Sequence, residues 1–158
     1  MNKSPLRYPG GKTRACKILE NILTTYFDID SYNNFISPFF GGGSFEFHIQ
    51  NKYKMKIIAN DKFKPLCHFW KTCKSSQKEL SSKLETYLNK ISKEDFIDMR
   101  KKILEEENIF EQSVMFFVIN RCSFSGATLS GGFSREASKK RFTKSSIEKI
   151  EKLNLEHF

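Results

Sequence analysis

The segment at residues 37–44, Ser-Pro-Phe-Phe-Gly-Gly-Gly-Ser, contains residue types that could bind a nucleoside. Glycine accepts positive φ angles and lets a ligand approach the backbone, and a helix that begins after the glycines offers unpaired N–H groups. Asp61 follows Gly43 at close to the spacing of roughly 20 residues at which nucleoside-binding βαβ units place a carboxylate for the ribose hydroxyls. The glycine loop and the acid together therefore predict a nucleoside site, which neither predicts alone.

A second glycine pair precedes a lysine near the N-terminus, at Gly10, Gly11 and Lys12. The pattern resembles the end of a P-loop, but that motif needs another glycine five residues before Gly11, where this sequence has Leu6. A nucleoside-triphosphate hydrolase is therefore disfavoured. Two glycines and a lysine at a helix start could still bind a carboxylate or a phosphate, and the plainer alternative is a capped helix with a surface lysine.

The residues around these segments predict alternating helices and strands. Apolar residues recur at helical spacing from Lys12 to Tyr26, residues 32–36 and 56–59 are strand-like, and residues 44–51 predict a helix between the two strands. This order predicts a parallel pair joined by a right-handed crossover. The nucleoside-binding half of the fold is therefore expected in residues 1–61.

The sequence after Asp61 predicts a mostly helical region. Its helical patterns cover residues 62–74, residues 77–88, a segment that begins with Ser92 as N-cap, and residues 145–153. Periodicity alone does not assign the apolar run at residues 114–119 to strand or helix, although the polar residues before it slightly favour a helix. The serines, glycines and basic residues of the segment 120–142 are typical of a surface loop.

The net charge of +9, from 27 Lys and Arg against 18 Asp and Glu, favours a polyanionic partner. Nucleic acid is the first such partner and an anionic membrane the second, whereas solubility alone also explains a lysine-rich composition. The four cysteines have neither zinc spacing nor the density of a secreted scaffold, so we expect reduced thiols and no metal site. No signal peptide or apolar span occurs, which predicts an intracellular protein, cytoplasmic or nucleoid-associated, rather than a membrane protein.

Four segments resemble, in order and spacing, the Dam-type (D12 class) adenine-N6 DNA methyltransferases: residues 7–12, 37–44, 60–61 and 120–126. The resemblance covers essentially the whole chain. It implies an α/β, Rossmann-like fold of S-adenosylmethionine-dependent methyltransferases, with an incomplete sheet and a mostly helical target-recognition insertion. It also implies that S-adenosylmethionine is bound by Tyr8, Gly11, Lys12, Phe39, Gly41, Gly43 and Asp61. Ser37 departs from the family, which usually has an acidic residue there.

The resemblance further implies a site-specific enzyme of the restriction-modification type that acts on double-stranded DNA. Residues 1–61 would be the cofactor-binding part, residues 62–143 the target-recognition region, and residues 144–158 a return helix towards a catalytic strand. The residues expected to approach DNA are Asn120, Arg121, Ser125, Thr128, Lys139, Lys140 and Arg141. A structural arginine that holds the loop is nearly as good an interpretation of Arg121.

The Asp-Pro-Pro-Tyr type motif with which the family holds its target adenine does not occur, because no two prolines adjoin in these 158 residues. We therefore expect a truncated or split chain with no catalytic residue of its own, which is inactive alone and which, if split, a companion chain completes by supplying this motif. The alternatives are a non-catalytic DNA-binding subunit or degenerate relative, and an RNA adenine methyltransferase. Cytosine-C5 methylation is disfavoured because it needs a cysteine nucleophile, usually after proline, and no Pro-Cys pair occurs.

Overall fold

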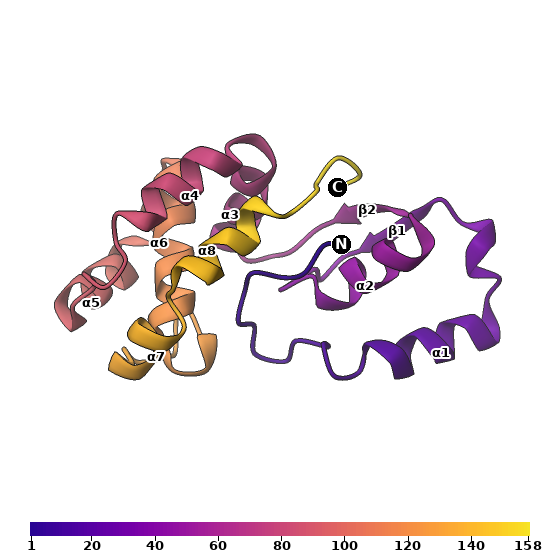
Figure 1. Cartoon of the computed structure of the whole chain (residues 1–158), viewed down its shortest axis with the longest axis horizontal. Helices are drawn as coiled ribbons and strands as arrows, with labels where there is room; N and C mark the ends of the chain where they lie inside the picture. The colour runs from indigo at the N-terminus through magenta and orange to yellow at the C-terminus, as the bar shows by residue number, and fades with distance from the viewer.

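A small parallel sheet lies beside a bundle of helices in the computed structural model, which describes all residues 1–158 (Figure 1). The sheet pairs β1 (Asn34–Ser37) with β2 (Lys56–Ala59), in a register that places Asn34 opposite Lys56 and Ser37 opposite Ala59. The parallel pair and the second strand confirm the sequence prediction, whereas the first strand begins two residues later than predicted. The fold is therefore mixed and mostly helical, with two strands.

Helix α2 (Ser44–Tyr53) connects the two strands, and α1 (Cys16–Tyr26) packs against α2. The predicted helix start at Lys12 is wrong, because Gly10 has a φ of +75° and the N–H of Gly11 donates to the carbonyl of Tyr8, so the chain turns before the helix begins. Glu20 of α1 is buried and accepts hydrogen bonds from His48, Lys52 and Tyr53. This buried carboxylate joins the two helices.

The remaining chain forms the helical bundle. Its elements are α3 (Lys64–Ser75), α4 (Gln77–Glu85), α5 (Lys93–Lys102), α6 (Ile109–Cys122), α7 (Arg135–Lys140) and α8 (Lys144–Glu151), with short 3-10 turns η1 (Ile29–Ser31) and η2 (Phe124–Gly126). Helix α6 is buried on nearly all sides and packs against α3, α4, α5 and α7, which confirms the helical interpretation of residues 114–119. The expectation of a continuous loop over residues 120–142 is wrong in part, because α6 continues to Cys122 and Ser134 caps α7.

Both ends of the chain are tied to the sheet half (Figure 1). The Asn2 amide donates to the carbonyl of Asn154 at 2.6 Å and accepts from the N–H of Asn154 at 2.7 Å. The N–H of Ile57 in β2 donates to the carbonyl of His157 at 2.9 Å. The C-terminal segment therefore lies along the outer edge of β2.

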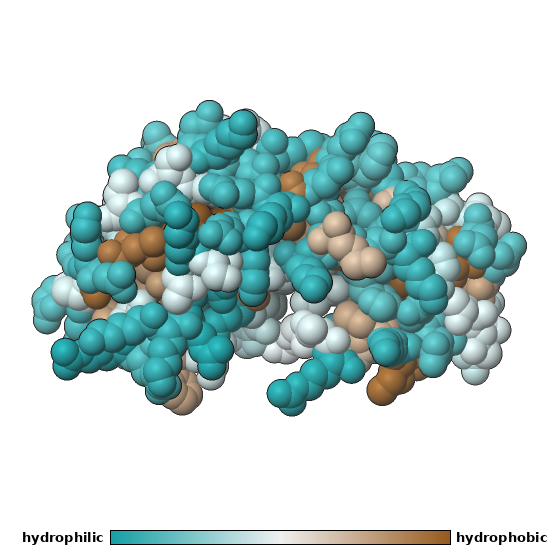
Figure 2. Space-filling view, viewed as in Figure 1, coloured by the Kyte–Doolittle hydropathy of each residue, from teal (hydrophilic) through white to brown (hydrophobic).

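The surface in Figure 2 is largely hydrophilic, with separate small hydrophobic patches. None of the helices combines the length and the apolar character needed to cross a bilayer. All four cysteines are free thiols, and burial raises the pKa of Cys122 to about 12.

Candidate functional site

The loop between β1 and α2 is held to the residues that follow β2 through Gly41. The N–H of Gly41 donates to Oδ2 of Asp61 at 2.8 Å, and the carbonyl of Gly41 accepts from Nε1 of Trp70 at 3.1 Å. The other carboxylate oxygen of Asp61 accepts from the N–H of Phe63 at 3.1 Å. Each oxygen keeps a second lone pair, so Asp61 braces the loop and can still accept a hydrogen bond from a ligand.

The ring of Tyr8 lies against this glycine loop. A Cβ on Gly41 would lie 2.9 Å from Cε1 of Tyr8, and one on Gly42 would lie 2.8 Å from Cβ of Tyr8, so only glycine allows this approach. Burial raises the pKa of Tyr8, and the nearby Asp61 and Cys67 raise it further. The structure thus brings together Tyr8, Gly41 and Asp61, three of the residues predicted to surround one ligand.

Of the other predicted ligand-binding residues, Phe39 and Gly43 lie in the glycine loop, whereas Gly11 and Lys12 lie on a separate turn before α1. Gly43 has a φ of +68°, and a Cβ there would lie 2.5 Å from Cζ of Phe40, which makes glycine necessary at the start of α2. Phe39 is 84% exposed and is therefore free to stack on a planar group. Gly11 and Lys12 lie on the exposed turn before α1, and Lys12 forms no ion pair.

A carboxylate lies next to Ser37, the position at which the sequence departs from its resemblance. The hydroxyl of Ser37 donates to Oε1 of Glu46 at 2.7 Å, and Glu46 lies in the first turn of α2. The pKa of Cys16 is raised by burial first and then by the negative charge of Glu46. An acid is therefore present beside the glycine loop although the strand itself ends in serine.

Asn120 joins the N-terminal segment to the loop that follows α6. Its amide oxygen accepts from the N–H of Arg7 at 3.0 Å, and its amide nitrogen donates to the carbonyls of Arg7 at 2.6 Å and Gly126 at 3.0 Å. The side chain is fully buried. Asn120 therefore lies behind the loop, where it fixes the distance between residue 7, next to Tyr8, and residue 126.

Three arginines lie near one another without an acidic partner. Arg121 is only 7% exposed, its Nε has no hydrogen-bond partner, and its Cζ lies 5.6 Å from the centre of the Phe117 ring. Burial, followed by the positive charges of Arg7 and Arg141, lowers the pKa of Arg121 to about 10. None of the three forms an ion pair with a carboxylate, so the cluster attracts anions.

The loop from Gly126 to residue 130 forms a cavity together with Tyr8. The cavity has a volume of about 250 Å³, and its lining includes Tyr8, Phe63 and Thr128. Ser125 is exposed next to it, with a φ of +57°. A residue predicted for the cofactor and one predicted for DNA thus line the same space, whereas the exposed Lys139 and Lys140 lie apart from this cavity on α7, and Lys140 pairs with Glu136.

Sequence reasoning missed three residues that organise this region: Arg7, Glu46 and Trp70. Arg7 stood within a recognised segment, and an arginine with no acid nearby in sequence could have indicated an anion site. Glu46 could have been found from its place in the first turn of the helix after the glycines. The hydrogen bond between Trp70 and Gly41 joins residues 29 positions apart and has no local signal.

Comparison with known families gives one match. The family described as D12 class N6 adenine-specific DNA methyltransferase matches residues 8–158. The matched range begins at Tyr8 and includes every residue predicted above to bind the cofactor or DNA. No curated protein was found to match the chain.

Proposed function

Because this chain belongs to the D12 class N6 adenine-specific DNA methyltransferases, we propose that it binds S-adenosylmethionine at the glycine loop and double-stranded DNA beside it. The observation that carries this proposal is the contact between Tyr8, Gly41 and Asp61, which forms a cradle where a Cβ would not fit. We also propose that the two strands belong to a Rossmann-like sheet. When bound, S-adenosylmethionine supplies an electrophilic methyl group for N6 of adenine.

The residues at the loop fit the chemical groups of this cofactor. The free lone pairs of Asp61 suit ribose hydroxyls, and the exposed ring of Phe39 suits the adenine face. The unpaired ammonium of Lys12 suits the methionine carboxylate, and Glu46 suits the methionine ammonium. Glu46 would then provide the negative charge that Ser37 lacks, and the hydroxyl of Ser37 would hold the Glu46 carboxylate in place.

DNA would be held by the arginine cluster and read by the loop at residues 125–134. Arg121, Arg7 and Arg141 suit a backbone phosphate, because a bound phosphate supplies the anion that a buried guanidinium without a carboxylate lacks. Lys139 and Lys140 would add phosphate contacts along α7, and Ser125 and Thr128 lie where base edges could be approached. The cavity between Thr128 and Tyr8 then connects the DNA side with the cofactor side.

No two prolines adjoin in these 158 residues, so we propose that the residues that hold the target adenine lie outside them. In this proposal the chain binds and orients the two substrates, and a second polypeptide segment completes the catalytic centre. Methyl transfer to a random duplex DNA library tests this proposal, measured with this chain alone and then with an added chain that carries the Asp-Pro-Pro-Tyr motif. Full methyltransferase activity of the isolated chain would overturn the proposal that a second polypeptide segment completes the catalytic centre.

Isothermal titration with S-adenosylmethionine tests the cofactor site. Phe39→Ala is expected to weaken binding by roughly 2- to 10-fold, as expected for an aromatic stacking contact, without loss of stability because the ring is 84% exposed. Phe124→Ala is the matched control, since Phe124 is 72% exposed and lies outside the glycine loop. Asp61→Ala should weaken binding further, and unchanged affinity in both variants would exclude this site.

A non-catalytic DNA-binding subunit and an RNA methyltransferase give different results in the same experiments. Salt-sensitive binding of duplex DNA without any binding of S-adenosylmethionine would favour the non-catalytic subunit. Tighter binding of structured RNA than of duplex DNA, with the cofactor bound, would favour RNA as the substrate. Competition between the two polymers at one salt concentration makes the comparison.

A further inference from the structure

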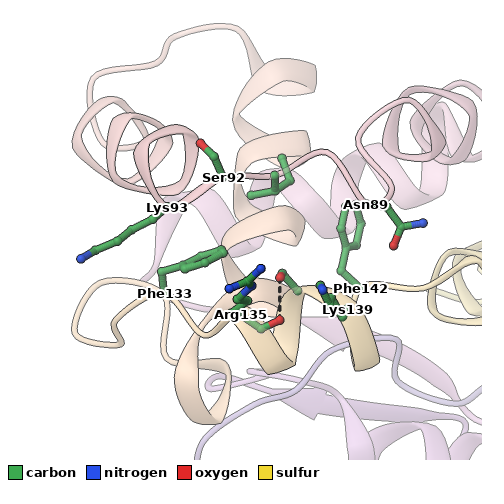
Figure 3. Close-up of a pocket in the computed structure, with 9 residues that line it drawn as sticks. Asn89, Ser92, Lys93, Phe133, Arg135, Lys139 and Phe142 are labelled. Atoms are coloured by element: carbon green, nitrogen blue, oxygen red, sulfur yellow. Dashed lines mark hydrogen bonds between the residues drawn. The ribbon is translucent and has the colours of Figure 1, made fainter.

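A cavity of about 300 Å³ lies between α7 and the turn that precedes α5, away from the glycine loop (Figure 3). Phe133 and Phe142 form its apolar part, and Arg135 and Lys139 reach it from α7. Its size is at the lower end of the range of roughly 300–1,000 Å³ for small-molecule sites. The cavity is therefore large enough for a ligand with one ring system.

The charged groups around the cavity are mainly positive. Neither Arg135 nor Lys139 forms an ion pair. Lys93 also lines the cavity and is unpaired, but its side chain extends away from it (Figure 3). No acidic side chain lines the cavity. Of the acids near it in the chain, Glu136 pairs with Lys140 at 3.1 Å, Asp95 accepts from the N–H of Ser92 at 2.9 Å, and Glu94 lies in the first turn of α5. A ligand of this cavity would accordingly be an anion.

Aromatic side chains next to unpaired cations match the two parts of a nucleotide. Bases stack on aromatic rings, and their phosphates bind arginine and lysine. Phe133 is half-buried and keeps part of its ring accessible, while its other contacts fix it against Phe96 at a ring distance of 5.6 Å. We propose that this cavity binds one nucleotide, with the base against Phe133 and the phosphate on Arg135 and Lys139.

The position of the cavity indicates where the nucleotide comes from. Phe133 lies near the end of the loop at residues 125–134, and Nη1 of Arg100 holds this loop by donating to the carbonyl of Gly131 at 2.6 Å. A DNA strand on the loop would therefore run from the Tyr8 cavity towards this one, and the nucleotide would be an unstacked one that flanks the target. The DNA source rests on the proposed function, whereas binding of a free nucleotide does not.

Thymidine monophosphate is a suitable probe, because it lacks the adenine that the proposed cofactor site would bind. In ¹H–¹⁵N spectra of the full chain we expect it to shift the resonances of residues 89–93 and 133–142, and thymidine without phosphate to bind more weakly. Arg135→Glu should weaken binding by roughly tenfold or more, as for the loss of a charge-assisted hydrogen bond. Absence of shifts in these segments would overturn the proposal.

The matched control is Lys78→Glu, which makes the same charge change at an exposed residue in the first turn of α4. Arg135 is exposed and opens α7, where an acidic residue favours the helix start, so the variant should fold. Lys139→Gln provides a second variant that should also weaken binding. Equal affinity for thymidine monophosphate in Arg135→Glu and Lys78→Glu would refute the phosphate assignment.

Fluorescence anisotropy with labelled DNA distinguishes the two sources. If Arg135→Glu loses more DNA affinity than Lys78→Glu, the nucleotide belongs to a DNA strand; if both lose equally while thymidine monophosphate still binds the wild type, the cavity serves a free nucleotide. Titration with S-adenosylmethionine separates this inference from the proposed function. If the chain binds the cofactor and DNA but thymidine monophosphate shifts no resonances, only the proposed nucleotide cavity is wrong. If thymidine monophosphate shifts the resonances but neither the cofactor nor DNA binds, only the proposed function is wrong.

Discussion

Replacement of Asn120 by alanine should destabilise the chain strongly and loosen the Tyr8 side of the site. The substitution removes three hydrogen bonds, one from the N–H of Arg7 and two to the carbonyls of Arg7 and Gly126. At about 1 kcal/mol for each hydrogen bond, the free energy of unfolding should fall by about 3 kcal/mol. The loss is larger if water does not reach the backbone groups left without partners. A typical domain has only about 5–15 kcal/mol of stability, so the effect is large.

Urea unfolding at 25 °C measures this loss, and the fluorescence of the single tryptophan, Trp70, reports it. Asn108→Ala is the matched control, because it makes the same change at the other end of α6. Asn108 caps the helix by accepting from the N–H groups of Phe110 and Glu111, and loss of a cap costs about 1 kcal/mol. Only Asn120→Ala should also weaken binding of S-adenosylmethionine, because residue 7 is released beside Tyr8.

Two results would refute this reasoning. The first is an Asn120→Ala variant whose unfolding free energy lies within about 0.5 kcal/mol of the wild type, the range of an ordinary surface substitution. The second is equal destabilisation by Asn108→Ala and Asn120→Ala, with the cofactor affinity of both unchanged. The hydrogen bonds of Asn120 would then not fix the N-terminal segment to the loop.

Three further predictions follow from single side chains. The hydrogen bond from Lys52, followed by those from His48 and Tyr53, lowers the pKa of Glu20 to about 2. The contribution of Glu20 to stability should therefore be complete above about pH 4.5 and be lost as the pH falls towards 2. Glu20→Gln should flatten acid denaturation in that window, and an unchanged acid transition would contradict it. Gly43→Ala should lower the free energy of unfolding by about 1–3 kcal/mol, because Gly43 has a φ of +68° and a Cβ there would lie 2.5 Å from the Phe40 ring. Gly132→Ala is the control, since a Cβ at Gly132 meets nothing within 4 Å and should change stability little. Thermal unfolding of the two variants makes the comparison. Arg121→Met should raise stability in buffer without phosphate, because it removes a buried cation that has no acidic partner. It should also remove about one phosphate contact, so the slope of log K for DNA binding against log salt concentration should change by about 0.9. A less stable variant with an unchanged salt slope would show that the arginine cluster does not bind phosphate.

The sequence predicted what depends on local signals. Three glycines before a helix and an acid after the next strand predicted that Gly41 and Asp61 lie together, and the structure joins them by a hydrogen bond. That a ligand binds there stays a prediction. The parallel strands followed from the order of apolar runs, and Ser92 was recognised as an N-cap from the acids behind it. Each of these signals is either a local residue pattern or a spacing typical of a βαβ unit.

Contacts between distant segments had no such signal. Asn120 stands 113 positions from Arg7, so its buried hydrogen bonds depend on how α6 packs beside the N-terminal segment. A direct contact of Asn120 with DNA stays a prediction, although its observed hydrogen bonds are internal. Helix α7 was missed because six mostly polar residues give too short a pattern, and α1 begins late because a turn held by Gly11 competes with the helix.

The hydrogen bonds between the two ends of the chain affect the order in which the protein can fold during synthesis. Asn2 and Asn154 are 152 positions apart, and the edge of β2 is completed only by the carbonyl of His157. A growing chain on the ribosome therefore makes the glycine loop early but cannot close the sheet half around it until nearly all 158 residues have emerged. Such distant contacts slow folding. During synthesis, the bundle waits for α8 and the sheet half for the last residues, so the glycine loop would be protected from proteases only when nearly the whole described chain has emerged.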